Sequence, residues 1–197
     1  MQDVVLPAYE KSLNGINALL PYTISVYRFF EVEPNAHARF DALSRTYHYF
    51  FHFQKNPFLH QRSYLYRGQL DLDKMNQAAQ LLLKYEDFSC FSKADTQTFT
   101  NNCNISYADF EETANGIVFR IKANRFLRNM VRAIVGTLIM VGKGQLMPDE
   151  IEKIILSKDR SQAGQSAPAC GLYLAHIAYP YISDNKCSTQ LIEDHGS

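Results

Sequence analysis

Residues 113–148 carry six basic side chains and no acidic one, in a chain whose formal net charge is zero. Within this stretch, residues 124–136 (NRFLRNMVRAIVG) have the composition of the first turns of a helix. At about 100° per residue, the apolar side chains form one stripe and most of the basic ones fall in an arc opposite it. The stripe comprises Leu127, Met130, Val131, Ile134, Leu138 and Val141, and the arc comprises Arg125, Arg128, Arg132 and Lys143. We expect a helix with an apolar back and a cationic front.

A cationic front taken alone is most often a solvated surface, but a second basic region favours an anionic partner. Between residues 37 and 67 the single acid is Asp41, and aromatic residues alternate with basic ones. The basic residues of this region are His37, Arg39, Arg45, His48, His52, Lys55, His60, Arg62 and Arg67. Basic groups hold phosphates and aromatic faces stack bases, at ~1–3 kcal/mol per base. Two such regions favour nucleic acid, although core packing remains the alternative for most of the aromatic rings.

Composition narrows the class of protein. A chain of 197 residues that is 46% hydrophobic can form one large or two small domains with a substantial core. The sequence contains no run of ~18 apolar residues, the length that would predict a membrane span. The four cysteines have no C-x-x-C spacing, which is typical of reduced thiols in a cytoplasmic protein. His48 and His52 share one face of a predicted strand, but no third ligand follows at fixed spacing, so we expect structural or RNA-facing histidines and no metal.

The hydrophobic periodicity predicts an α+β fold, a mainly antiparallel mixed sheet with helices packed on one face. We expect helices at residues 7–19, 73–85 and 148–157, in addition to the basic helix, which should end near Gly142 or Gly144. Strands are expected at residues 23–33, 43–54, 104–112, 117–123 and 171–179. Residues 113–116 (TANG) carry the Asn-Gly signal of a hairpin turn, and Asp71 or Asp73 can cap the second helix.

The order of motifs resembles the tRNA pseudouridine synthase A family from about residue 6 to residue 180. The resemblance is carried by residues 37–40 (HARF), 44–49 (SRTYHY), 124–136, 158–161 (KDRS), 167–168 (AP), 171–174 (GLYL) and 179–180 (YP). Residues 13–21 (LNGINALLP) and 85–88 (YEDF) fit the same family. Membership implies conversion of uridine to pseudouridine at positions 38 to 40 in the anticodon stem-loop of tRNA. It also implies a homodimer without a cofactor.

The resemblance assigns roles to individual residues. Arg132 is implied to support the catalytic carboxylate, and Tyr47 to stack on the extruded base. Leu172 and Leu174 are implied to line the pocket of the uracil. The residues implied to contact RNA are His37, Arg39, Arg45, Arg125 and Arg128.

One departure from the family pattern is larger than any match. The family's nucleophile is an Asp in an Arg-Thr-Asp-x-Gly-Val-His-type motif, and no such motif occurs in these 197 residues. We therefore expect a chain that corresponds to the C-terminal three quarters of the enzyme, with N-terminal strands missing and no activity alone. Its parts would be the remainder of an N-terminal half (residues 1–70), a C-terminal α+β half (71–182) and a disordered tail (183–197).

Two other functions stay open at this stage. A non-catalytic tRNA-binding protein would use the same basic and aromatic surface. A homodimerisation module without RNA affinity would leave both basic regions without a role.

Overall fold

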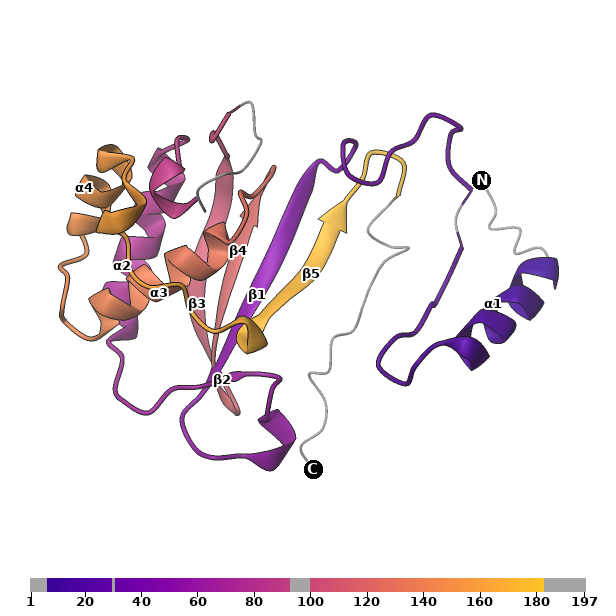
Figure 1. The fold of residues 1–197 in the computed structure, drawn as a ribbon, viewed down its shortest axis with the longest axis horizontal. Helices are drawn as coiled ribbons and strands as arrows, with labels where there is room; N and C mark the ends of the chain where they lie inside the picture. Colours follow the sequence, from indigo (N-terminus) through magenta and orange to yellow (C-terminus); the bar gives the residue numbers. More distant parts are fainter. Residues whose placement is uncertain (1–6, 30, 93–99, 183–197) are drawn as a thin grey trace. The chain divides into compact units, whose positions relative to one another are not determined.

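The computed structural model describes residues 7–29, 31–92 and 100–182 and divides into two compact units, Met1–Ala38 and Arg39–Ser197. The first unit contains the predicted helix, α1 (Pro7–Leu19) (Figure 1). Asn17 ties the following segment to this helix, since its amide donates to the Val26 carbonyl at 2.7 Å and accepts from the Val26 N–H at 2.8 Å. The strand predicted at residues 23–33 is wrong for its described residues, which form no ladder. Their β-branched and aromatic composition favours extension, but a strand also needs a partner, and the described part of this unit offers none.

The second unit is built on a five-stranded sheet with the order β2-β1-β4-β3, in which β5 also pairs with β1. Only β1 and β2 are parallel, so the sheet is mainly antiparallel, as predicted. The strands are β1 (Ser44–His52), β2 (Tyr64–Leu65), β3 (Ile105–Thr113), β4 (Gly116–Ala123) and β5 (Leu172–Ala178). The predicted strand at residues 43–54 is therefore the centre of the sheet, with β4 along one edge and β5 followed by β2 along the other.

Helices α2 (Leu72–Leu81), α3 (Met130–Gly142) and α4 (Glu150–Ser157) lie on one side of the sheet (Figure 1). The Asp71 carboxylate caps α2 by accepting from the Lys74 N–H at 3.1 Å, as predicted. Short 3₁₀ helices complete the unit: η1 (Pro57–Leu59), η2 (Leu82–Lys84), η3 (Ser89–Phe91), η4 (Arg160–Gln162) and η5 (Ala169–Gly171). The core lies between sheet and helices, and includes Tyr49, Phe119, Ile134 and Leu138. The α+β class is confirmed, whereas the missing strands and the division at residue 70 stay predictions, and residues 183–197 lie outside the described ones.

The hairpin between β3 and β4 turns where the Asn-Gly signal predicted. Thr113 pairs with Gly116, which leaves Ala114 and Asn115 as the two turn residues. Gly116 has φ 152°, and a Cβ there would overlap the carbonyl oxygen of Phe51 in β1. Glycine is therefore required because the turn lies against the neighbouring strand.

The basic helix begins later than its periodicity predicts. α3 starts at Met130, after Asn129 in the left-handed region at φ 67°, so residues 124–128 are a loop and not a first helical turn. This loop is fixed by tertiary hydrogen bonds: Asn124 exchanges two with Asn104, through its backbone N–H at 3.1 Å and its side-chain oxygen at 2.8 Å. The predicted apolar stripe is buried as expected. However, ten of the thirteen residues of α3 are buried and Arg132 is its only charged residue, so no cationic face runs along the helix.

The three cysteines within the described residues are thiols without disulfide partners. Burial raises the pKa of Cys90 to about 12 and that of Cys103 to about 11, so both stay protonated at neutral pH. Across the described ranges, no helix combines the length and the apolar character that a membrane crossing requires.

A close crossing fixes the segment between α4 and β5 to the middle of α3. The Thr137 hydroxyl accepts from the Gly164 N–H at 2.9 Å and donates to the Ala133 carbonyl at 2.8 Å. Beside it, a Cβ on Gly136 would overlap the carbonyl oxygen of Gln165. The segment can therefore approach the helix backbone only because residue 136 has no side chain.

We expect Gly136→Ala to lower the free energy of unfolding by about 1–3 kcal/mol, because the added methyl group forces helix and segment apart. Chemical denaturation monitored by circular dichroism measures this loss. Gln165→Ala is the matched control, since its exposed side chain is removed while its carbonyl stays. Equal free energies of unfolding for Gly136→Ala and the parent chain would contradict the close contact between Gly136 and the Gln165 carbonyl.

Candidate active site and nucleic-acid interface

Arg132 lies in the first turn of α3 and is held by two hydrogen bonds to one residue. Its Nε donates to the Ala167 carbonyl at 2.6 Å, and the Ala167 N–H donates to the Arg132 carbonyl at 2.9 Å. Within residues 7–29, 31–92 and 100–182, no carboxylate pairs with its guanidinium, and its two terminal nitrogens have no recorded partner. The side chain is thus fixed at Nε and keeps the donor pair that suits a carboxylate or a phosphate.

The segment that holds Arg132 is itself anchored by polar side chains to which the sequence analysis assigned no role. The Asn129 amide donates to the Ser166 hydroxyl at 2.6 Å. Arg160 donates to the carbonyls of Ala163 and Gly164 at 3.3 and 3.1 Å, and to the Ser166 hydroxyl at 3.1 Å. Asn is among the few residues that tolerate the left-handed conformation found at position 129, which is the one signal in the sequence that could have indicated it.

Tyr49 links the same segment to the sheet. Its buried hydroxyl donates to the Pro168 carbonyl at 2.6 Å. Burial raises the pKa of Tyr49 far above its ordinary value, and the nearby charge of Arg132 opposes only part of this rise. The phenol is therefore a permanent donor that holds the segment, and Arg132 with it, beside β1.

The structure places Tyr47, Leu172 and Leu174 on the helix-facing side of the sheet. Tyr47 in β1 is directly opposite Leu174 in β5, and Tyr49 is opposite Leu172. The ring of Tyr47 meets that of Phe126 edge to face, with centroids 5.1 Å apart. Leu174 is 47% exposed, so this apolar pair is accessible from solvent. These residues and Arg132 share one side of the sheet, and the apolar ones offer a surface on which a flat ring can pack.

The predicted RNA-contacting arginines gather where β1 begins and β4 ends, but one of them has a structural role. Arg45 donates to the Asn124 carbonyl at 3.1 Å and to the Arg39 carbonyl at 2.6 Å, so it joins two loops. The Arg39 guanidinium lies over the ring of Phe40, 5.6 Å from its centroid. Arg125 is half-buried and Arg128 is exposed, both in the loop before α3. His37 belongs to the first unit, whereas these four arginines belong to the second.

The two histidines considered for a metal site lie on the other side of the sheet. His48 is half-buried beside Phe50, with ring centroids 6.0 Å apart, and His52 is buried at the end of β1. The described residues contain no cluster of three metal-binding side chains.

Comparison with known proteins points to one family. A family model described as tRNA pseudouridine synthase matches residues 78–180. A tRNA pseudouridine synthase A from Parabacteroides distasonis is 49% identical over 165 residues, which are 84% of this chain and 66% of that protein. The protein of that name from Bacteroides thetaiotaomicron is 50% identical over 168 residues, 84% of this chain and 62% of its own length. A tRNA pseudouridine synthase A from Francisella tularensis is 39% identical over 183 residues, which are 92% of this chain and 70% of that protein.

The fold and the comparisons together define the class of protein. The chain belongs to the tRNA pseudouridine synthase family. It spans 66% and 62% of the length of the first two relatives named above.

The two tyrosines of β1, Tyr47 and Tyr49, form a matched pair for experiment. Of these two, only Tyr49 forms a hydrogen bond through its hydroxyl within the described residues. We expect Tyr49→Phe to lower the free energy of unfolding by about 1–3 kcal/mol, since the Pro168 carbonyl loses its donor. Tyr47→Phe should leave stability unchanged. Urea unfolding of both variants measures the difference, and equal midpoints would show that the Tyr49 hydroxyl does not hold the segment.

Proposed function

We propose that this chain provides the RNA-binding and base-positioning part of a tRNA pseudouridine synthase, an isomerase that acts at positions 38 to 40 of the anticodon stem-loop. The observation that supports this most is Arg132, anchored through Nε to Ala167 and without a recorded carboxylate partner in the described chain. It lies on the same side of the sheet as the apolar pair of Tyr47 and Leu174. Such an arrangement suits a carboxylate and a flat base brought together from outside the described residues.

The reaction explains why an arginine is needed at this point. The N1–C1′ bond of uridine breaks, the uracil turns, and C5 bonds to C1′. The proton lost from C5 is balanced by the proton gained at N1, so the overall change is an isomerisation without net oxidation. A carboxylate must stay ionised in a pocket from which water is excluded, although desolvation raises its pKa. A guanidinium beside it lowers that pKa again, and its planar fork pairs with both carboxylate oxygens. Arg132 takes this role in the proposal.

Tyr47, Leu172 and Leu174 receive the base. A uridine in a stem-loop must leave its stack, which costs a few kcal/mol, and packing against a ring and aliphatic side chains offsets part of that cost. Leu172 and Leu174 flank Tyr47 and Tyr49 across the β1–β5 pairing, which supports a pocket-lining role. Neither the isomerisation nor this packing requires a cofactor or metal.

The remaining basic residues contact the RNA backbone in this proposal. Arg39, Arg125 and Arg128 are the candidates for phosphate contacts, because the guanidinium of Arg45 is already bonded to two backbone carbonyls. Arg45 therefore acts by fixing the loops that carry Arg39 and Arg125. His37 is a further candidate contact. A cytoplasmic homodimer remains part of the proposal on family resemblance.

The decisive substitution is Arg132→Lys, tested in a chain extended at its N-terminus by a segment that carries the family's Arg-Thr-Asp-x-Gly-Val-His-type motif. We expect turnover on unmodified tRNA to fall by about 100-fold or more while tRNA affinity and stability persist, because lysine cannot form the two-bond pair. Arg120→Lys is the control for a general effect of replacing an arginine, since Arg120 lies in β4 opposite His48, on the other side of the sheet, and pairs with Glu111 of β3. Turnover of Arg132→Lys close to that of the parent would remove Arg132 from the role of carboxylate partner.

The 197-residue chain alone should bind tRNA but form no pseudouridine, because no Asp in it has the sequence context of the nucleophile. Filter binding measures the first property, and mass spectrometry of digested tRNA combined with selective chemical labelling measures the second. Pseudouridine formed at enzymatic rates would show that another carboxylate serves as nucleophile. Binding without activity, both alone and in the extended chain, would favour the non-catalytic tRNA-binding function.

A further inference from the structure

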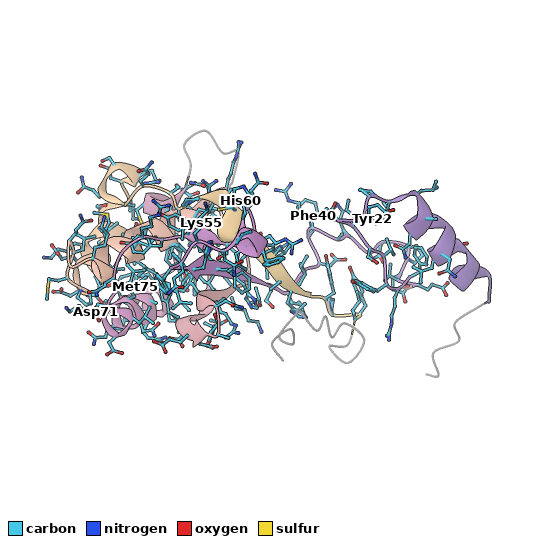
Figure 2. All side chains as sticks on the ribbon, turned by 90° about the horizontal axis from the view of Figure 1, so that it is seen from below. Tyr22, Phe40, Lys55, His60, Asp71 and Met75 are labelled. Atoms are coloured by element: carbon cyan, nitrogen blue, oxygen red, sulfur yellow. The ribbon has the colours of Figure 1, made fainter. Side chains whose placement is uncertain are left out.

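The loop between β1 and β2, residues 53–63, is a cationic surface outside the site described above. It carries Lys55, His60 and Arg62, and no acidic residue occurs between Asp41 and Asp71. All three side chains are exposed, and none forms an ion pair within the described part of the chain. Figure 2 labels Lys55, which precedes the N-cap of η1, and His60, which is its C-cap. The loop therefore has an uncompensated positive charge.

The backbone of this β1–β2 loop is well fixed. The Asn56 side chain caps η1 by accepting from the Phe58 N–H at 2.9 Å. The N–H groups of Arg62 and Ser63 both donate to the Leu59 carbonyl, at 3.0 and 3.2 Å. The far end is attached to β5, because the Tyr173 hydroxyl donates to the Arg62 carbonyl at 2.7 Å. A loop held in this way needs little further ordering when it binds a partner.

The hydrogen bonds of the loop do not account for the exposure of Phe58. It lies inside η1, yet its side chain is 84% exposed. An exposed aromatic ring between cationic side chains has the composition of a surface that binds unpaired nucleotides: the ring stacks on a base, and the cations contact phosphates on either side of it.

We propose that the β1–β2 loop binds an unpaired nucleotide of the tRNA, with Phe58 stacked on the base and Lys55 and Arg62 at the neighbouring phosphates. This inference rests on the proposed function, because it takes tRNA as the partner. The contact is separate from the base pocket: Tyr47 lies five residues before the end of β1, which corresponds to about 17 Å along the strand. The loop therefore holds a nucleotide other than the one that reacts.

The test is filter binding of an unmodified tRNA transcript to the 197-residue chain at several salt concentrations. We expect Phe58→Ala to weaken binding by about tenfold without changing the slope of log Kd against log salt, because stacking releases no counterions. Phe58→Tyr should restore the affinity. Lys55→Ala with Arg62→Ala should instead flatten the slope by about one unit per lost phosphate contact, and the Arg62 carbonyl that Tyr173 binds remains in place.

The control is Lys74→Ala with Lys153→Ala, which removes two exposed charges from α2 and α4. It should leave both affinity and slope close to those of the parent. If the parent binds tRNA and the Phe58 and Lys55/Arg62 variants match it at every salt concentration, the loop proposal is wrong while the proposed function stands. A parent chain that does not bind tRNA would overturn both. A Phe58→Ala variant with unchanged tRNA affinity but a changed oligomeric state in sedimentation would assign the surface to contact between protein copies.

Discussion

The reciprocal hydrogen bonds between Arg132 and Ala167 connect the parts of the second unit on which the candidate site depends. One residue of α3 both accepts from and donates to the segment before β5, and that segment also bonds to Tyr49 of β1. Hydrogen bonds near Arg132 therefore join α3, the segment before β5 and the central strand β1. These hydrogen bonds hold the Arg132 side chain in one position, which is the precondition for an electrostatic role in catalysis.

Sequence patterns correctly predicted those features of the fold that depend only on neighbouring residues. The cap at Asp71 and the hairpin turn before Gly116 each depend on neighbouring residues, and each was predicted from them. The predicted start of α3 was wrong because Asn124, which begins the loop before the helix, forms its hydrogen bonds with Asn104 and Arg45, which are distant in sequence. Periodicity cannot register such bonds. The same limit applies to residues 23–33, whose composition favours a strand but cannot state whether a partner exists.

The candidate site shows the same division. Tyr47, Leu172, Leu174 and Arg132 were named from a family resemblance, and the structure brings them to one side of the sheet. The supports of Arg132, namely Asn129, Arg160 and Ser166, could not be named because their function lies in contacts across loops. Arg45 illustrates the reverse: its charge suggested an RNA contact, whereas its hydrogen bonds show that it holds the carbonyls of Arg39 and Asn124.

The place of Arg132 within its helix has an electrostatic consequence. It is the third residue of α3, so its positive charge lies at the end of the helix where the peptide dipoles also concentrate positive charge. A cation at such an end is disfavoured by about 0.3–1 kcal/mol at an exposed site. An anion that reaches the guanidinium relieves this repulsion in addition to forming its own bonds. Binding of an anion at Arg132 is therefore coupled to the stability of α3, so that occupancy of the site and stability of the helix rise together.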